Sequence, residues 1–380
     1  MKTIGVLGAG QLGRMLALSG FPFEMKFQFF DTSGSPSVGL EPTYIEPNEP
    51  LSSAGLKTFL DECDVVTYEF EHLPLDLVEH IESQHTLYPP AKSIEICQDR
   101  EKEKALFDAL AIPTTKYRIV NSELELSKAV EELGLPLVCK TTTEGYDGKG
   151  QYVLKQASDI GKAWSTIGNR TLIAEEFINF SRELSVIAVR SASGELKVYP
   201  LAENQHNDGI LRYSTAPAPQ LDKETAAQAS LYMKELLEAL KHVGVLTLEL
   251  FETPNGLIAN EMAPRVHNSG HWSMLGAMSS QFENHIRAIS GLPLGDTEAH
   301  QPTCMINLIS HKGDLEKILR LPYAQVHLYG KEERAGRKLG HINVTANSYD
   351  ELRWRVENII QHLHDYPSFE QLKNKEPTTM

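Results

Sequence analysis

The segment "LTLELFETPNGLIANEM", residues 246–262, is typical of two apolar β-strands joined by a tight turn at "PNG". If Asn255 is the centre of that turn, symmetric pairing places Glu249 directly opposite Glu261. Like charges that face each other across a strand pair repel, so a purely structural hairpin would avoid them. A divalent cation between the carboxylates would remove the repulsion, and Mg²⁺ combines few carboxylates with phosphate oxygens and water. The hairpin therefore predicts a magnesium site, with Asn260 as a nearby oxygen donor.

The alternative is a solvated hairpin whose two glutamates diverge into water. Register decides between the two interpretations, because a slip of one residue sends one carboxylate to the other face of the sheet. The apolar character of both strands favours the metal site.

A glycine-rich loop precedes this hairpin by about a hundred residues, in "VCKTTTEGYDGKGQ", residues 138–151. Glycine lets backbone N–H groups approach phosphate oxygens closely, and Lys140 and Lys149 could add positive charge. The loop joins two predicted strands and lacks the GxxxxGK[ST] pattern, which excludes a Walker A loop. An exposed glycine turn explains the loop equally well by itself. Together with a magnesium site, the loop favours nucleotide binding.

Strands and helices alternate over roughly the first hundred residues, which indicates a parallel α/β domain. Apolar strands are predicted at "TIGVLGAG", "KFQFFD" and "CDVVTYEF", with a helix at "QLGRMLALSG". Later segments predict helices at "SELELSKAVEEL" and over roughly 222–242, and strands at "LPLVCK", "QYVL", "TLIAEEFI" and "ELSVIAVR". A chain of 380 residues is long enough for two or three such domains.

Composition narrows the class of protein. Hydrophobic residues make up 41% and charged residues 23% of the chain, as in ordinary globular enzymes. A formal net charge of −15 argues against a nucleic-acid partner. No secretory signal or apolar run of membrane-spanning length is present, and the four dispersed cysteines favour reduced thiols. We therefore expect a cytoplasmic enzyme without membrane or nucleic-acid partners.

The order of a strand ending in lysine, a glycine-rich loop, "EEFI" and paired glutamates resembles the ATP-grasp superfamily of carboxylate–amine ligases. "GAGQLGRM", "YEFEH", "EGYDGKGQ", "APRVHNSGHW" and "GRKLGH" are similar to the N5-carboxyaminoimidazole ribonucleotide synthetase family of purine biosynthesis. The resemblance runs to about residue 345. It implies an α/β protein of ATP-grasp fold with three domains. These are an N-terminal Rossmann-like domain (1–98), an ATP-grasp domain carrying the flap (99–295) and a small C-terminal domain (296–380).

The implied reaction is an ATP- and bicarbonate-dependent carboxylation of the amino group of 5-aminoimidazole ribonucleotide, with release of ADP and phosphate. Bicarbonate attacks the γ-phosphate to give carboxyphosphate. The amine then captures this intermediate, or carbon dioxide released from it. The resemblance also implies Mg²⁺ as cofactor and a homodimer. Glu249 and Glu261 become the implied metal ligands, in agreement with the hairpin argument.

The resemblance also assigns roles to individual residues. Nucleotide-binding residues would be Arg100, Lys140, the flap residues Gly145, Tyr146, Asp147, Gly148, Lys149, Gly150 and Gln151, the adenine-pocket residues Glu175, Glu176, Phe177 and Ile178, and Glu183, His206, Asn260 and Glu261. Glu183 would hold the ribose hydroxyls. The ribotide would contact Gln11, Leu12, Glu71, Tyr146, Asp147, Arg265, His267, Lys331, Arg337 and Lys338. The catalytic residues would be Arg265, His267 and Asp147.

Several alternatives remain open at this point. "GAGQLG" matches the GxGxxG pattern, and Asp31 follows about 20 residues later, as in a dinucleotide-binding dehydrogenase. A non-catalytic nucleotide-binding protein is a further candidate, which the intact glutamate pair, Lys140 and Arg265 disfavour. A formate-dependent glycinamide ribotide transformylase and a biotin carboxylase are also candidates, which "RVHNSGHW" and "YEFEH" disfavour. Either Glu69 or Glu71 could face the ribotide. His267, Asp147 and a phosphate oxygen are all candidates for the general base.

Overall fold

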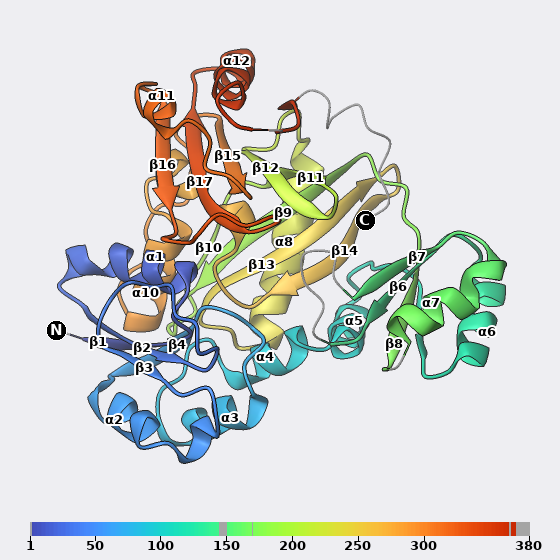
Figure 1. Cartoon of the computed structure of the whole chain (residues 1–380), viewed down its shortest axis with the longest axis horizontal. Helices are drawn as coiled ribbons and strands as arrows, with labels where there is room; N and C mark the ends of the chain where they lie inside the picture. Colours follow the sequence, from blue (N-terminus) through green and yellow to red (C-terminus); the bar gives the residue numbers. More distant parts are fainter. Residues whose placement is uncertain (1, 144–149, 169, 365, 370–380) are drawn as a thin grey trace.

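The computed structural model describes residues 2–143, 150–168, 170–364 and 366–369. Its strands form three sheets, around which the helices are arranged (Figure 1). An N-terminal lobe and a smaller lobe of four strands flank the largest sheet (Figure 1). In this view the C-terminal strands of the largest sheet lie above its other strands. The predicted fold class of mixed helices and strands is confirmed, whereas the domain boundaries at 98/99 and 295/296 stay predictions.

The N-terminal sheet is parallel throughout and has the strand order β3-β2-β1-β4. Its elements are β1 (Thr3–Leu7), α1 (Gln11–Gly20), β2 (Lys26–Asp31), β3 (Thr43–Ile45), α2 (Ala54–Glu62), β4 (Val65–Tyr68), α3 (Leu75–Gln84) and α4 (Ala91–Cys97), with 3₁₀ turns at Phe21–Phe23 and Pro50–Ser52. Strand β1 is almost wholly buried because it lies between β2 and β4. The carboxyl ends of these strands therefore meet at the edge from which α1 begins.

The small lobe is an antiparallel sheet of order β5-β8-β6-β7 with two helices packed on it. Its elements are β5 (Tyr117–Val120), α6 (Glu123–Leu133), β6 (Leu137–Thr141), β7 (Gln151–Leu154), α7 (Ile160–Ile167) and β8 (Leu172–Glu176), with a 3₁₀ turn at Ala157–Asp159, and α5 (Arg100–Ala109) leads into it. The predicted flap connects β6 to β7, and its residues 144–149 lie outside the described residues.

The large sheet has nine strands, in the order β14-β13-β9-β11-β12-β15-β17-β16 with β10 paired to β9. Its elements are β9 (Arg182–Arg190), β10 (Leu196–Val198), β11 (Ala202–Asn207), β12 (Ile210–Ala216), α8 (Lys223–Ala239), β13 (Gly244–Thr253), β14 (Gly256–Ala263), the 3₁₀ turn η4 (Asn268–Gly270), α9 (Ser273–Gly276), α10 (Gln281–Ser290), β15 (Thr303–Ile309), α11 (Leu315–Leu319), β16 (Ala324–Leu328), β17 (Lys338–Thr345) and α12 (Tyr349–Ile360). Strands β12 and β15 pair directly, so the predicted second and third domains share one sheet.

The core is built from both faces of this large sheet. One hydrophobic cluster joins α1 of the N-terminal lobe to α10, and another joins α8 to strands β9, β13 and β14. Among the described residues, no helix is both long and apolar enough to cross a membrane. The four cysteines, all of which the structure describes, form no disulfide.

Candidate active site

A cavity of about 310 Å³ opens where the N-terminal lobe, the hairpin of β13 and β14 and the C-terminal strands meet. It brings together predicted site residues from all three parts of the sequence. Those that line it are Gln11, Leu12, Glu71, Arg100, Glu249, Glu261, Arg265, His267 and Lys338. Residues more than 300 positions apart thus share one chamber, which makes it the candidate active site.

The hairpin of β13 and β14 has a different register from the predicted one. Thr253 pairs with Gly256, so the turn is centred between Pro254 and Asn255. With that register throughout, Glu249 would oppose Asn260. Between the pairs Leu250–Ala259 and Leu248–Met262, however, β14 has two residues where β13 has one, which is a β-bulge.

The bulge is what brings the two carboxylates together. Its two residues are Asn260 and Glu261, and Glu249 is the single residue that faces them. Both glutamates consequently line the same cavity. The predicted symmetric pairing was wrong near the turn, but the predicted meeting of Glu249 and Glu261 on one face is confirmed.

The electrostatics of this carboxylate pair fit a cation. Burial, followed by the neighbouring charge of Glu261, raises the pKa of Glu249 to about 8. Arg100 Nη1 lies 3.3 Å from Glu261 Oε2 and offsets part of the repulsion. Two carboxylates face an open chamber, and the raised pKa shows that the negative charge on Glu249 is disfavoured without a cation. This pair matches the donor set that Mg²⁺ takes alongside phosphate.

Lys140 on β6 forms an ion pair with Glu175, and neither residue lines the chamber. Its Nζ lies 2.6 Å from Glu175 Oε2, while Lys104 Nζ lies 2.9 Å from Oε1 and Thr115 Oγ1 donates to the same atom at 2.8 Å. Burial alone would raise the pKa of Glu175, but the two lysines outweigh it and lower the pKa. The Glu175 side chain therefore holds the two lysines, and its predicted contact with adenine stays a prediction.

Replacing Lys140 with Met should weaken ATP binding more than it weakens the fold. Lys104 and Thr115 still satisfy Glu175 in this variant, so we expect the free energy of unfolding to fall by only about 1–2 kcal/mol. Losing a cation at the phosphates should raise the KM for ATP roughly tenfold. Urea unfolding and initial rates at varied ATP measure the two effects. An unchanged KM would contradict the predicted phosphate contact.

The rest of the "EEFI" segment lies at the end of β8 and just beyond it. Glu176 accepts a hydrogen bond from the backbone of Lys116 at 3.1 Å, and Phe177 N–H donates to Pro136 O at 3.3 Å. Ile178 is partly buried. Their contacts with adenine stay a prediction.

On the opposite wall, two polar pairs face the chamber. Arg265 binds Glu71 with both ends of its guanidinium, Nε to Oε2 and Nη2 to Oε1, the latter at 2.9 Å. Burial would raise the pKa of Glu71, but Arg265 outweighs it and holds the pKa at about 2. His267 Nε2 lies 3.5 Å from Glu249 Oε1, and burial followed by the charge of Arg265 lowers the pKa of His267 to about 3.

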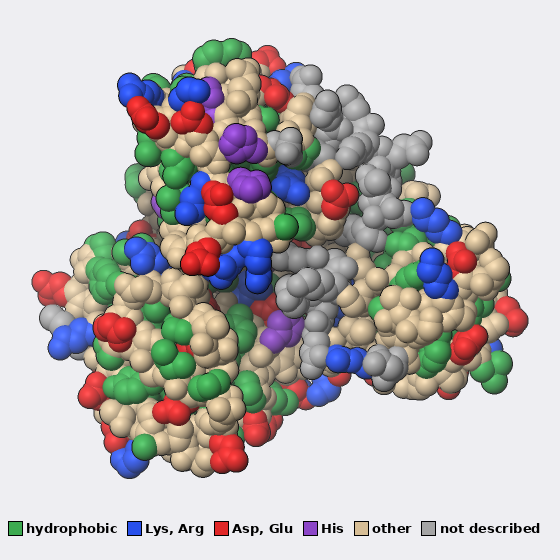
Figure 2. Space-filling model, in the orientation of Figure 1, with side chains coloured by type: hydrophobic (Ala, Val, Ile, Leu, Met, Phe, Trp, Pro, Cys, Tyr) green, Lys and Arg blue, Asp and Glu red, His purple; other side chains and the backbone are tan. Residues whose placement is uncertain are grey.

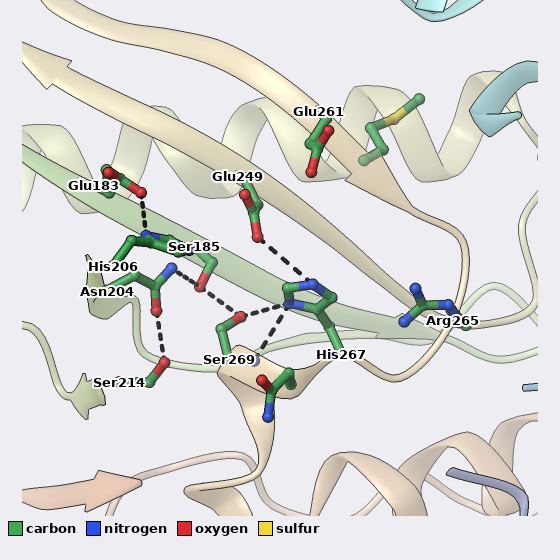
Figure 3. Close-up of polar contacts among 12 residues, drawn as sticks. Glu183, Ser185, Asn204, His206, Ser214, Glu249, Glu261, Arg265, His267 and Ser269 are labelled. Atoms are coloured by element: carbon green, nitrogen blue, oxygen red, sulfur yellow. Dashed lines mark hydrogen bonds and ion pairs between the residues drawn. The ribbon is translucent and has the colours of Figure 1, made fainter. Parts of the chain in front are cut away.

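Glu183 and His206 form a further pair on the same sheet, outside the cavity lining. His206 Nδ1 lies 2.6 Å from Glu183 Oε2. Burial would lower the pKa of His206, but Glu183 reverses the direction and raises it. Figure 3 shows this pair on β9 and β11, with β9 next to the strand that carries Glu249. The predicted contact of Glu183 with a ribose stays a prediction.

The glycine turn between β1 and α1 is occupied by Glu69. Its carboxylate accepts hydrogen bonds from the backbone N–H groups of Gly10 and Gly13, the second at 2.6 Å. A Cβ atom at Gly8 would lie 2.5 Å from the Glu69 side chain, and one at Gly10 would lie 2.6 Å from it. The amides that would bind a pyrophosphate in a dinucleotide fold thus already donate to Glu69. Of the two candidate glutamates, only Glu71 lines the chamber.

We expect NADH fluorescence to stay unchanged when this protein is added. Glu69 fills the anion position and would repel a pyrophosphate there. Glu69→Gln keeps the shape of the side chain and should likewise give no enhancement. A saturable enhancement with either protein would restore the dehydrogenase interpretation.

A basic cluster of Lys331, Arg337 and Lys338 lies between β16 and β17. Lys331 Nζ donates to Gln11 Oε1 at 2.5 Å, which connects the cluster to the first turn of α1. Burial lowers the pKa of Lys331, and the charges of Arg337 and Lys338 lower it further, so the three cations lie close together. Figure 2 shows Lys and Arg side chains gathered where the C-terminal strands meet the N-terminal lobe. An acidic chain thus concentrates positive charge at this junction.

Comparison with known proteins identifies the family. Three family models match: a ribonucleotide synthetase preATP-grasp domain (1–98), an ATP-grasp domain (105–282) and a phosphoribosylaminoimidazole carboxylase C-terminal domain (303–355). The N5-carboxyaminoimidazole ribonucleotide synthase of Vibrio cholerae serotype O1 is 42% identical over 359 residues, covering 92% of this chain and 93% of the relative. The chain belongs to the N5-carboxyaminoimidazole ribonucleotide synthase family.

Solved structures of the N5-carboxyaminoimidazole ribonucleotide synthase family agree with this fold. The Thermus thermophilus enzyme has a TM-score of 0.90 at 41% identity, covering 96% of this chain and 99% of that chain. The Aspergillus clavatus enzyme, crystallised with ADP and 5-aminoimidazole ribonucleotide, has a TM-score of 0.86 at 31% identity, covering 95% of this chain and 98% of that chain. The predicted resemblance, the ATP-grasp fold and the expectation of an ATP-dependent ligase are confirmed.

Some residues predicted from the resemblance to N5-carboxyaminoimidazole ribonucleotide synthases are not placed in the chamber. The flap residues Gly145, Tyr146, Asp147, Gly148 and Lys149 lie outside the described residues. Gly150 and Gln151 lead into β7, where Gln151 pairs with Lys140. Their roles stay predictions.

Sequence reasoning missed Glu103, which lines the chamber of this synthase, and the neighbouring Lys104. Lys104 is almost wholly buried on α5, and its Nζ also donates to Asn260 O at 3.0 Å. It lies three residues before Phe107, which is buried on the same helix face. A lysine within the apolar stripe of an amphipathic helix needs a buried partner, and this is the signal that could have revealed it.

Proposed function

We propose that this protein carboxylates the amino group of 5-aminoimidazole ribonucleotide, using ATP and bicarbonate and releasing ADP and phosphate. The single observation that carries the proposal is the chamber itself. It combines a carboxylate pair suited to a metal with an arginine, a histidine and a basic anion site. A phosphate donor, an oxyanion and a ribotide phosphate each need one of these groups. The family relative crystallised with ADP and this ribotide supports the choice of substrates.

In the first step, a bicarbonate oxygen forms a bond to the γ-phosphorus while the bond to ADP breaks. Arg100 and Lys140 hold phosphate oxygens, and the guanidinium of Arg265 grips the planar oxyanion with two N–H groups. In the second step, the ribotide amine attacks the carboxyl carbon of carboxyphosphate, or of carbon dioxide released from it. Phosphate leaves and the amine loses a proton. Most of the rate comes from holding these reactants in line and away from water.

Glu249 and Glu261 are the proposed ligands of Mg²⁺, with Asn260 beside them in the bulge. When bound, Mg²⁺ neutralises charge on the phosphate oxygens and so favours attack by an anionic nucleophile. The raised pKa of Glu249 supports this assignment, because a cation removes the repulsion that causes part of it.

Lys331, Arg337 and Lys338 are the proposed site for the 5′-phosphate of the ribotide. Gln11 and Leu12 come from the first turn of α1 and line the chamber, and Gln11 accepts a hydrogen bond from Lys331 of this cluster. The ribotide then spans the junction between the lobes and places its amine toward Arg265. We further propose that the protein acts as a homodimer in the cytoplasm, since closed twofold dimers are the commonest assemblies.

The deciding experiment measures ADP formation from ATP with Mg²⁺ and bicarbonate, with and without 5-aminoimidazole ribonucleotide. We expect turnover that depends on both bicarbonate and the ribotide. ADP release that ignores the ribotide and responds to another amine or acid would keep the ATP-grasp chemistry and overturn the substrate.

A further inference from the structure

A row of buried hydrogen bonds runs from His267 into the large sheet (Figure 3). Ser269 Oγ lies 2.9 Å from His267 Nδ1, and Ser185 Oγ lies 2.7 Å from Ser269 Oγ. Asn204 Nδ2 lies 2.9 Å from Ser185 Oγ, and Ser214 Oγ lies 2.7 Å from Asn204 Oδ1. The four residues beyond His267 are all at most 5% exposed, so water does not compete for these bonds.

The direction of this row is set at the His267 end. The backbone N–H of Ser269 points at His267 Nδ1 at 3.3 Å, and an N–H can only donate. Nδ1 is therefore an acceptor and carries no proton. The Ser269 hydroxyl must therefore also donate to Nδ1, because otherwise no hydrogen would lie between Ser269 Oγ and the bare nitrogen.

Each hydroxyl has a single hydrogen, so the remaining directions follow in turn. Ser269 has used its proton on His267 and must accept from Ser185. Ser185 has then used its own proton and must accept from the Asn204 amide nitrogen. The Asn204 oxygen consequently faces Ser214, which donates to it. The row has only this one consistent arrangement.

A neutral imidazole with a bare Nδ1 carries its proton on Nε2. That atom lies on the chamber side of the ring, 3.5 Å from Glu249 Oε1. Glu249 pairs with Ser185 across β13 and β9, so the sheet that holds the row also fixes the proposed metal ligand. The geometry therefore sets a donor, and not an acceptor, on the side of the ring that faces Glu249 in the chamber.

We propose that Ser269 is a positioning residue, backed by Ser185, Asn204 and Ser214, that keeps the proton of His267 on Nε2 so that His267 acts as a hydrogen-bond donor. This rests on the proposed function for the identity of the acceptor, an oxygen of bicarbonate or carboxyphosphate. In this tautomer Nε2 already carries a proton and cannot take one from the ribotide amine, and Nδ1 is turned toward Ser269. That proton must pass to another acceptor, such as an oxygen of the departing phosphate.

The test uses the full-length protein labelled with ¹⁵N-histidine, in which Nδ1 and Nε2 of each ring give separate NMR signals for protonated and bare nitrogen. His267→Gln identifies the signal among the 14 histidines. We expect the wild-type His267 signal to show a bare Nδ1 and a protonated Nε2. A protonated Nδ1 would overturn the proposal, and this measurement needs no variant at position 269 to fold.

Ser269→Ala then removes the hydroxyl and leaves only the longer backbone hydrogen bond on Nδ1. We expect a mixture of tautomers, a fall in kcat of about 10- to 100-fold, and a KM for ATP that stays within about twofold. Unchanged tautomer and kcat would overturn the proposal. The NMR measurement does not require substrate. If Ser269→Ala changes the tautomer of His267 but the wild-type protein shows no ribotide-dependent turnover, the proposed function is contradicted and the positioning role of Ser269 stands.

Ser93 and His242 provide a matched control within the same chain. Ser93 Oγ lies 2.9 Å from His242 Nδ1, both side chains are fully buried, and His242 Nε2 donates to Val245 O at 3.0 Å. Ser93→Ala removes an equivalent hydroxyl from a pair of residues that do not line the chamber. We expect it to leave kcat unchanged, and an equal loss of kcat in both variants would mean that Ser269 contributes only to general stability.

Discussion

Glu261→Gln should reduce ADP formation about 10³-fold at saturating Mg²⁺. The variant keeps the size of the side chain but removes one of the two carboxylates that the β14 bulge places in the chamber. A metal at the phosphates contributes several kcal/mol to such a reaction, and each 1.36 kcal/mol corresponds to a tenfold change in rate. Initial rates at increasing Mg²⁺, with ATP, bicarbonate and ribotide held saturating, measure the loss.

Glu252→Gln is the control on the same hairpin. Glu252 binds Arg182 at the far end of β13 and does not line the chamber. Its replacement should leave kcat within about twofold, while lowering stability by roughly 1 kcal/mol because Arg182 loses a partner. Retention of more than about a tenth of wild-type activity by Glu261→Gln would contradict the metal assignment.

Local sequence patterns predicted most of the fold. "QLGRMLALSG", "KFQFFD" and "QYVL" correspond residue for residue to α1, β2 and β7. Helix and strand periodicity depend only on neighbours, so such elements can be recognised without knowing the tertiary structure. The joining of β12 to β15 could not be predicted this way, because pairing between strands some 90 residues apart depends on the packing of the whole sheet.

The site was less predictable where it depends on irregular backbone. Apolar residues in β14 fall at Leu257, Ile258, Ala259, Met262 and Ala263, so they do not alternate with polar ones. The sequence therefore gives no sign of the bulge at Asn260 and Glu261, and a symmetric turn centre was assumed. The glycine fingerprint misled in a different way, because a pattern of glycines shows only that something approaches closely. Here that is the side chain of Glu69.

Arg265→Met should lower the free energy of unfolding by about 3–5 kcal/mol near neutral pH. Arg265 is the partner that holds the pKa of Glu71 at about 2 against the opposing effect of burial. Without it, burial raises the Glu71 pKa above its unfolded value of about 4.3. Urea unfolding at several pH values measures both the loss and its pH dependence.

The sign of that pH dependence follows from the two pKa shifts. In the wild type, Glu71 has a depressed pKa, so it adds to the free energy of unfolding above about pH 4.3. This stabilisation is lost as the pH falls toward 2. In Arg265→Met, the pKa is raised, so the destabilisation is greatest at high pH and shrinks as the carboxyl takes up a proton. The stability difference between the two proteins should therefore narrow between pH 8 and pH 5.

Two further variants separate an unpaired buried carboxylate from the simple loss of an arginine. Adding Glu71→Gln to Arg265→Met removes the stranded charge, so the double variant should be more stable than Arg265→Met alone. Arg118 and Glu132 form a comparable Arg–Glu pair with about half of each side chain exposed. Because water already solvates both of those charges, Arg118→Met should cost no more than about 1 kcal/mol. An equal cost at Arg118 and Arg265, or no recovery in the double variant, would show that Glu71 is not held by Arg265.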